Sequence, residues 1–447
     1  MRIERFVLRG GYGYLNLDIR FNQKLTFLTG INGSGKTTVV RGLVAALSPS
    51  FSTISNLQFE TMSVELELEG KQHTISVTKT QDLLRISIEN IPEALEVPIF
   101  KQSTYEPPYK FAEREAEFYR EMHLTMASNA VAKFLEELPT PMFLDLERRS
   151  QIPRGKRAQY ADPSSFRARP ILGGSLREGL MEAVELAEDS FRQFLARQQA
   201  YMNYLRRDLI LTTFVPQEFG AFYAGIEIPD PIAANIQVRN QRKIVSQTLQ
   251  DLDIEDPAVD KFFDDVEQTL KLTEGRDTRS LLSDDSGRKL LGELLRVQPL
   301  LGQINRIVSI VEKHNEKIKR AQAEIDKFLD ALNRFLTDGN KKLEFQANGR
   351  MRVRYNEIPL KGMGGLSSGE RQLLVILTHL YFNSLARKAN VLIIDEPELS
   401  LHVKWQEMFV GAMEAASPNI QFILATHSPS IILERTDACV DISELKR

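Results

Sequence analysis

A glycine-rich stretch near the start of the chain has the residue types that hold the phosphates of a nucleotide. The run GINGSGKTT occupies positions 30–38, between a short apolar strand at 24–30 and a segment with helical spacing. Glycines let backbone N–H groups converge on a phosphate at a helix N-terminus, a lysine bridges the β- and γ-phosphates, and a hydroxyl binds Mg²⁺. We predict that ATP is bound by Gly30, Asn32, Gly33, Ser34, Gly35, Lys36, Thr37 and Thr38, with Lys36 also catalytic and Thr37 a Mg²⁺ ligand.

Two apolar runs later in the chain end in residues suited to hydrolysis. VLIIDEPE (391–398) ends in acids, and FILATHSP (422–429) reaches a histidine after its apolar part. Functional groups of such sheets gather at the carboxyl ends of the strands. We predict that Asp395 binds Mg²⁺, that Glu396 polarises the attacking water, and that His427 contacts the γ-phosphate.

A second glycine-serine turn, GGLSSGERQ, opens another helix more than three hundred residues after the first. Ser367 and Glu370 have the spacing of a capping box, which alone explains a well-capped helix. Ser368 and Gly369 also present a hydroxyl, an open N–H and a positive helix end, which are features that grip a γ-phosphate. We therefore predict a second set of nucleotide ligands: Ser367, Ser368, Gly369 and Glu370.

The composition limits the classes of partner. Among 447 residues, 57 Lys and Arg stand against 60 Asp and Glu, so a nucleic-acid contact must come from a local patch. The basic run 148–169 could contact DNA, although a solvated loop or a protein-docking surface explains it equally well. The single cysteine, Cys439, excludes internal disulfides and is expected to be buried. No stretch is apolar enough to span a membrane, so we expect a cytoplasmic protein.

The pattern of the remaining chain predicts two parts of one head with helices between them. Strands are expected at 1–21, as a meander over 61–91, at 141–149, and at 342–347 and 350–355; helix is expected over 109–138. Heptad spacing over 174–336 predicts two long helices through Leu180, Val184, Ala187, Phe191, Phe194, Gln198, Tyr201 and Leu205, and through Ile304, Val311, Ile318, Ile325 and Leu332. These helices are either a short arm or bundle core. Breaks are expected at Pro216, Pro229, Pro231, Pro257 and Pro299.

The stretch LSSGERQ resembles the signature of ATP-binding-cassette (ABC) ATPases, and the phosphate loop, signature, IIDEPELSLH and ATHSP occur in the order of that superfamily. The chain is most similar to its soluble SMC, RecF and OLD-like branch, and within that branch to the PtuA-type ATPases of the Septu phage-defence system. The resemblance implies an α/β fold: an ABC-type P-loop head, with a mixed sheet and an antiparallel meander, interrupted by a large helical insertion with a short coiled-coil-like arm. The expected parts are 1–105, 106–340 and 341–447.

The resemblance also implies how the two loops are used. In this superfamily two heads meet head to tail, and the signature of each closes the nucleotide site of the other. Leu399–His402 would then be the D-loop at the seam, an adenine contact would lie within 9–14, and Gln151 is a weak candidate for the glutamine between the lobes. We expect a homo-oligomer built on such dimers.

Three functions are compatible with this resemblance. The first is a slow ATPase that regulates a separately encoded nuclease, of HNH type, in antiphage defence. The second is a RecF-like clamp for DNA repair or recombination. The third is an assembly scaffold that binds ATP with little turnover.

Overall fold

The structure is a computed structural model that describes residues 1–48, 51–101, 107–145, 176–213, 231–251, 257–273 and 285–444. Its contacts form two compact units. Unit 1 is Met1–Phe191 with Asp326–Arg447, and unit 2 is Arg192–Ile325. The expected fold class is confirmed, because an α/β head built from both ends of the chain is interrupted by helices. Residues 107–145 lie in unit 1, and the finer division at 105 and 340 stays a prediction.

A five-stranded sheet of parallel neighbours forms the centre of unit 1. Its strands, in spatial order, are β14 (Cys439–Asp441), β3 (Leu25–Thr29), β13 (Gln421–Ala425), β12 (Val391–Asp395) and β8 (Met142–Asp145). Every residue of β12 and β13 is buried, as expected for parallel strands covered on both faces. The strand predicted at 141–149 is confirmed as far as Asp145; the next residues lie outside the described chain.

A second, antiparallel sheet contains the predicted meander. Its strands, in spatial order, are β2 (Leu15–Arg20), β1 (Arg2–Gly11), β4 (Thr61–Leu68), β5 (Lys71–Lys79), β6 (Leu83–Ile88) and β7 (Leu95–Pro98). The expectation of one strand over 1–21 is wrong, because β1 and β2 pair through a turn at GGYG. Gly10 and Gly13 have φ of 65° and 79° there, a conformation that glycine adopts readily, and Tyr12 between them has φ of 49°.

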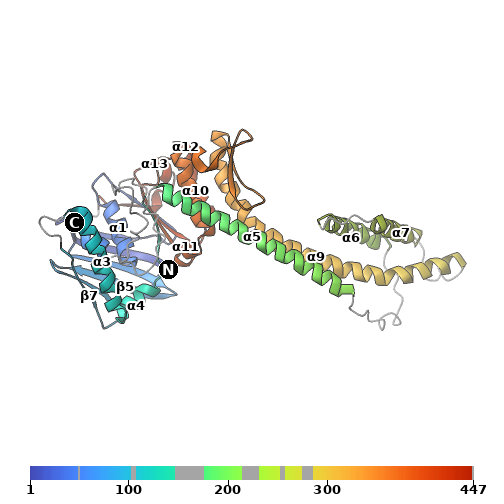
Figure 1. The fold of residues 1–447 in the computed structure, drawn as a ribbon, viewed down its shortest axis with the longest axis horizontal. Coiled ribbons are helices and arrows are strands. Elements are labelled where there is room, and N and C mark those ends of the chain that lie inside the picture. The colour runs from blue at the N-terminus through green and yellow to red at the C-terminus, as the bar shows by residue number, and fades with distance from the viewer. Residues whose placement is uncertain are drawn as a thin grey trace. The chain divides into compact units, whose positions relative to one another are not determined.

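Helix α1 (Lys36–Leu47) lies between the two sheets, and its apolar residues join one core with both of them (Figure 1). The short helix α2 (Phe51–Asn56) follows it. The single helix expected over 109–138 is two helices, α3 (Pro108–Met126) and α4 (Ala130–Glu137). The break has a local cause, since the side chain of Asn129 accepts the N–H groups of Val131 and Ala132 and so starts a new helix.

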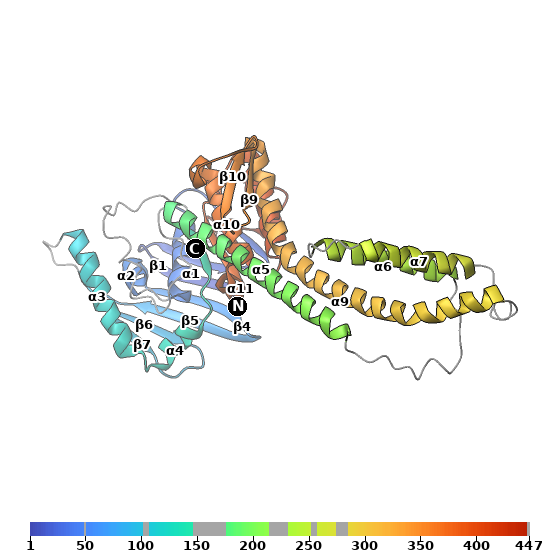
Figure 2. The same cartoon turned by 45° about the vertical axis from the view of Figure 1, so that its right-hand side comes forward.

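The insertion is helical in its described parts, as Figure 2 shows. Its helices are α5 (Leu176–Thr213), α6 (Pro231–Asp251), α7 (Pro257–Thr273) and α9 (Asp285–Leu336). The heptad residues lie on α5 and α9, and Leu180, Ala187, Phe194, Leu205, Val311, Ile325 and Leu332 are buried. Within unit 2, His314 Nε2 of α9 lies 3.2 Å from Asp208 Oδ2 of α5. The coiled-coil-like arm itself stays a proposal.

The prolines of the insertion act differently from one another. Pro231 and Pro257 are the first residues of α6 and α7, where a missing N–H costs nothing. The break expected at Pro299 is wrong, because the 52 residues of α9 run through it. One proline removes a single helical hydrogen bond, and a long helix retains the others. Pro216 and Pro229 lie outside the described residues.

The chain re-enters unit 1 at Asp326, within α9. After α9 come a 3₁₀ turn, η3 (Thr337–Gly339), and the predicted strands β9 (Lys341–Phe345) and β10 (Met351–Tyr355), with β11 (Ile358–Pro359) at the sheet edge. After the 3₁₀ turn η4 (Gly362–Gly365) come α10 (Ser368–Phe382), α11 (Ser384–Ala389), α12 (Val403–Ala416) and α13 (Pro429–Ile432), and η5 (Thr436–Ala438) leads into β14. None of the described helices is both long and apolar enough to cross a membrane.

Candidate nucleotide site

The phosphate loop connects β3 to the first residue of α1, Lys36. Gly30, Gly33 and Gly35 have φ of 138°, 77° and 110°, values that side chains with a Cβ rarely adopt. Gly30 is also crowded, since a Cβ there would lie 2.7 Å from Ser443 Oγ and 2.9 Å from Ser34 Oγ. The predicted glycines are therefore required by the backbone path of the loop.

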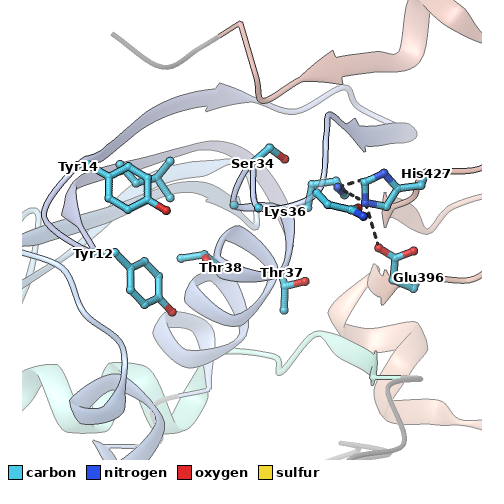
Figure 3. Close-up of a pocket in the computed structure, with 12 residues that line it drawn as sticks. Tyr12, Tyr14, Ser34, Lys36, Thr37, Thr38, Glu396 and His427 are labelled. Atoms are coloured by element: carbon cyan, nitrogen blue, oxygen red, sulfur yellow. Dashed lines mark hydrogen bonds and ion pairs between the residues drawn. The ribbon is translucent and has the colours of Figure 1, made fainter.

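A cavity of about 510 Å³ opens over this loop. It is lined by Tyr12, Tyr14, Leu15, Asn32, Gly33, Ser34, Gly35, Lys36, Thr37, Thr38, Glu396 and His427. Figure 3 places the two tyrosines at one end and Lys36, Glu396 and His427 at the other, with Thr37 and Thr38 between them. The cavity therefore joins predicted residues from three separate parts of the chain, and Tyr12 and Tyr14 fall within the range predicted for an adenine contact.

Strand register explains why these groups meet. Asp395 of β12 pairs with Ala425 of β13, and Ala425 pairs with Leu28 of β3. The phosphate loop, Glu396 and His427 follow these three strand ends within two residues. Neighbouring parallel strands thus deliver all three groups to one edge of the sheet.

Lys36 is 5% exposed and lies against the histidine. Its Nζ donates to the carbonyl oxygen of Gly30 at 3.0 Å and lies 2.5 Å from His427 Nε2. Burial lowers the pKa of Lys36, and the nearby carboxylates, Glu396 first among them, oppose that shift. Burial, followed by the charge of Lys36, lowers the pKa of His427. A neutral imidazole therefore faces the ammonium group.

Glu396 occupies an unusual backbone position. Its φ is 50°, in the left-handed region, and its N–H donates to the carbonyl oxygen of Ala425 at 2.9 Å. Non-glycine residues in such conformations cluster at functional sites. Burial, followed by the neighbouring acids Glu398 and Asp395, raises the pKa of Glu396 to about 8. Its Oε1 lies 3.6 Å from His427 Nε2, so the predicted base and the predicted γ-phosphate contact are adjacent.

Glu398 is a residue that the sequence reasoning did not single out. Its Oε2 accepts the hydroxyl of Thr426 at 2.7 Å, and its Oε1 accepts the N–H of His427 at 2.7 Å. The third acid of DEPE was the available signal, but a strand end with several acids does not show which of them reaches the next strand.

The residues predicted for Mg²⁺ carry the oxygen donors that this ion prefers, and of the two only Thr37 lines the cavity. Asp395 is 2% exposed. The described chain contains no cluster of three or more His, Cys, Asp or Glu residues for a metal. Mg²⁺ at phosphates needs only one or two protein ligands, because phosphate and water oxygens complete its shell. The buried hydroxyl of Ser34, which has no hydrogen-bond partner among the described residues, also fits a missing ligand.

The second glycine-serine turn does not line the cavity of its own chain. Ser367 caps α10, and the predicted capping box with Glu370 is present. Glu370 is 3% exposed, and its Oε1 and Oε2 lie 3.1 and 2.8 Å from Lys341 Nζ. The structure therefore gives Glu370 a positioning role, while nucleotide binding by Ser367, Ser368, Gly369 and Glu370 stays a prediction.

The predicted D-loop packs directly on this turn. A Cβ on Gly369 would lie 2.3 Å from the carbonyl oxygen of Ser400, and Gln372 Nε2 donates to the carbonyl oxygen of Pro397 at 3.0 Å. Leu399 and Val403 beside it are 40% and 54% exposed. The signature and D-loop thus form one surface unit that carries exposed apolar side chains.

The sequence also led to predictions for Gln151, for the basic run 148–169 and for Cys439. Gln151 and the basic run 148–169 lie outside the described residues. The expectation that Cys439 is buried is only partly met, because it is a free cysteine of intermediate exposure.

Comparisons with known families point to nucleotide-dependent proteins. A family model described as "AAA domain" matches residues 8–348, which is most of the chain. A second model, described as "AAA domain, putative AbiEii toxin, Type IV TA system", matches residues 299–434.

Two curated relatives share short segments with the chain. The "Retron Vc95 probable ATPase" of Vibrio cholerae serotype O1 biovar El Tor is 37% identical over 86 residues, 17% of each chain. The "Retron Ec83 probable ATPase" of Escherichia coli is 37% identical over 75 residues, 15% of this chain and 14% of the relative. The aligned part therefore spans less than a fifth of either relative.

Solved structures with an overall likeness include Smc heads. The Smc head domain with an extended coiled coil bound to the C-terminal domain of ScpA, from Pyrococcus furiosus, is 13% identical with a TM-score of 0.39, over 96% of this chain and 91% of that one. An SmcHead bound to the C-winged helix domain of ScpA is 10% identical with a TM-score of 0.40, over 97% and 92%. Likeness at this level carries no argument about function.

Proposed function

The chain belongs to the AAA-domain family of ATPases, and from this premise we propose that it hydrolyses Mg²⁺-ATP at sites shared by two copies of the chain. The observation that carries the proposal is the separation of the two elements that are predicted to bind phosphate. The phosphate loop, Glu396 and His427 line one cavity, and the signature residues do not. The capped end of α10, where Ser367 is exposed and Ser368 is half-buried, is then available to the nucleotide of a partner.

Each cavity residue has a chemical role in this proposal. Lys36 binds the β- and γ-phosphates, and His427 orients the γ-phosphate. Glu396 accepts a proton from the attacking water in its ionised form, whose population rises as the pH approaches its pKa of about 8. Bound Mg²⁺, held through Thr37 and Asp395, would neutralise the charge that develops on the phosphates. Tyr12 and Tyr14 lie at the opposite end of the cavity from these groups and offer their rings to the adenine.

The head-to-tail dimer is tested by mixing two inactive variants. Lys36→Ala removes phosphate binding, and Ser368→Arg places a bulky charge at the signature. In a mixed dimer, one site retains both a native Lys36 and a native Ser368. Random pairing then restores about a quarter of the wild-type ATPase rate, since half of the dimers are mixed and each has one intact site.

The control for this mixture is Ser384→Arg, the same change at an exposed serine that begins α11. It should retain the wild-type rate alone. If the two inactive variants form mixed dimers by mass spectrometry and recover no ATPase activity, the shared site is refuted.

We propose further that the ATPase controls a separately encoded nuclease, of HNH type, in antiphage defence. The names of the retron relatives and of the toxin-antitoxin family support such a role, as does the resemblance to Septu ATPases. DNA contact through 148–169 belongs to the same proposal. A nuclease gene beside this one would support it, and neighbouring replication genes would favour the RecF-like clamp instead.

An assembly scaffold that binds ATP with little turnover is the remaining alternative. A substitution of the predicted base, Glu396, distinguishes it from an ATPase. Glu396→Gln keeps the shape of the side chain and removes its ability to accept a proton. We expect ATP binding without turnover. A variant with unchanged turnover and unchanged activity would show that hydrolysis at this carboxylate is not the mechanism.

A further inference from the structure

We propose that Glu398 is a positioning residue of the hydrolytic site, which holds the histidine segment 426–428 against the strand end that carries Glu396. This inference rests on the proposed ATPase function and deepens it. Glu398 does not line the cavity, so it acts through its neighbours and not on the nucleotide.

The two oxygens of Glu398 hold consecutive residues of the neighbouring strand end. One accepts the hydroxyl of Thr426 and the other accepts the N–H of His427, both at 2.7 Å. Hydrogen bonds to a carboxylate are about twice as strong as neutral ones. This carboxylate therefore helps to set the direction of the His427 backbone, and with it the path of the imidazole toward Lys36.

The histidine segment is tied in a second way that also passes through Thr426. The N–H of Ser428 donates to Thr426 Oγ1 at 3.0 Å, and Ser428 Oγ lies 2.5 Å from Gln406 Oε1 of α12. Thr426 is fully buried. The Thr426 hydroxyl thus donates to Glu398 while it accepts from Ser428, so Glu398 is linked to all three residues of the segment. Gln406 and the carbonyl oxygen of Leu28, which accepts the N–H of Thr426 at 3.1 Å, hold the same segment from other sides.

The turn that carries Glu398 fixes its own position. The N–H of Leu399 donates to the carbonyl oxygen of Glu396 at 3.1 Å, and the N–H of Leu401 donates to the carbonyl oxygen of Glu398 at 3.0 Å. Glu396, at the start of this turn, has the left-handed backbone conformation. A short hydrogen-bonded turn therefore links Glu396, the predicted base, to Glu398, which in turn holds His427, the predicted γ-phosphate contact.

Glutamine weakens this arrangement. A carboxylate accepts with both oxygens, whereas an amide accepts with one atom and donates with the other. In Glu398→Gln, one amide orientation turns the –NH₂ group toward the N–H of His427, which sets two donors against each other. The other orientation turns it toward the Thr426 hydroxyl, which must then accept instead of donate and loses its charge-assisted bond. Displacement of a catalytic group by about 1 Å can cost up to ~100-fold in rate. We expect kcat to fall at least ~10-fold, with the KM for ATP changed less than ~3-fold, because the phosphate loop is untouched.

The experiment measures steady-state ATPase kinetics of the full chain with Mg²⁺. The wild type and Glu396→Gln come first, followed by Glu398→Gln, Glu398→Asp, and the matched control Glu407→Gln at an exposed position on α12. The control has the same charge change and should keep the wild-type kcat. Glu398→Asp retains the charge but shortens the reach, so its kcat should fall between those of the wild type and Glu398→Gln.

Thr426 supplies a second test if Glu398→Gln does not fold. Thr426→Ser keeps the hydroxyl, and Thr426→Val replaces it with a methyl group of similar size. We expect the serine variant to retain kcat within ~3-fold and the valine variant to lose at least ~10-fold, as for a misplaced catalytic group.

Several results would overturn the inference. A folded Glu398→Gln with the kcat of Glu407→Gln overturns it, as does a rise in KM at unchanged kcat, which would assign Glu398 to nucleotide binding. Equal kcat for Thr426→Ser and Thr426→Val also overturns it. In each of these cases the proposed function still stands if the wild type hydrolyses ATP and Glu396→Gln does not. A wild type without turnover refutes both proposals.

Discussion

Replacing Gly369 by alanine should disturb the contact between the signature and the D-loop. The added Cβ would lie 2.3 Å from the carbonyl oxygen of Ser400, and ordinary contact begins near 3.4 Å. Ser400 would have to retreat by about 1 Å, yet its φ of 71° already lies in the left-handed region, which leaves its backbone few alternatives. The clash is with backbone and cannot be relieved by a rotamer change.

The cost follows from overpacking. Inserting a methyl group into a packed region costs about 1–3 kcal/mol, and the helix propensity of alanine returns at most about 1 kcal/mol at this first-turn position. We therefore expect a net loss of about 1–2 kcal/mol in the free energy of unfolding. We also expect a kcat loss of at least ~10-fold, because the displaced D-loop lies at the proposed seam.

The assay uses the single tryptophan of the chain, Trp405. Its Cζ3 would lie 3.4 Å from the added Cβ, and its Nε1 donates to Asp338 Oδ2 at 3.1 Å, so its fluorescence reports this junction. Denaturation by urea, followed at Trp405, gives the local stability without assuming that both units unfold together.

Gly411→Ala is the matched control. Gly411 lies inside α12, and a Cβ there meets nothing within 4 Å. The same change should therefore stabilise the protein by about 0.5–1 kcal/mol, since glycine is costly in a helix interior. If both variants shift the urea midpoint in the same direction, or if Gly369→Ala retains wild-type kcat, the reasoning about the close approach is wrong.

Two further predictions concern acid stability and nucleotide affinity. Burial lowers the pKa of His379 from 6.5 to about 4, so protonation of this residue favours the unfolded state. The stability that the neutral imidazole contributes to the folded protein is fully present above pH 6.5. It is lost as the pH falls toward 4, by up to about 3 kcal/mol in the free energy of unfolding. His379→Gln should show a smaller difference in urea midpoint between pH 7.5 and 4.5 than the wild type, and an equal difference would refute this assignment. Tyr14 is 66% exposed at the cavity, so Tyr14→Ala should raise the KM for ATP about 5- to 100-fold with little change in stability, whereas Tyr14→Phe should not. An unchanged KM in the alanine variant would remove this residue from the adenine contact.

The predictions that the structure confirmed rest on consecutive residues. The phosphate loop, the buried strand before Asp395 and the capping box of Ser367 are each specified by a short run of the chain. Glycine conformation, hydrophobic runs and cap chemistry act over a few residues, so these elements could be predicted without knowledge of the fold.

The errors have equally local causes. One strand was expected over 1–21 because alternation continues on both sides of GGYG, and two helices were merged because Asn129 was not recognised as a cap. A break was expected at Pro299, where a long helix tolerates proline. In each case one or a few local residues decided whether the helix or strand continued or ended.

What the sequence by itself determined is the set of groups that can handle a triphosphate and the strands and helices that carry them. The tertiary structure decided which of these groups meet. It brings Tyr12 and Tyr14 to the phosphate loop, joins Glu398 to Thr426 and His427, and leaves the signature outside the cavity of its own chain. The physical reason is that such contacts depend on the register of parallel strands and on the close approach of distant backbone segments, which no local run of residues specifies.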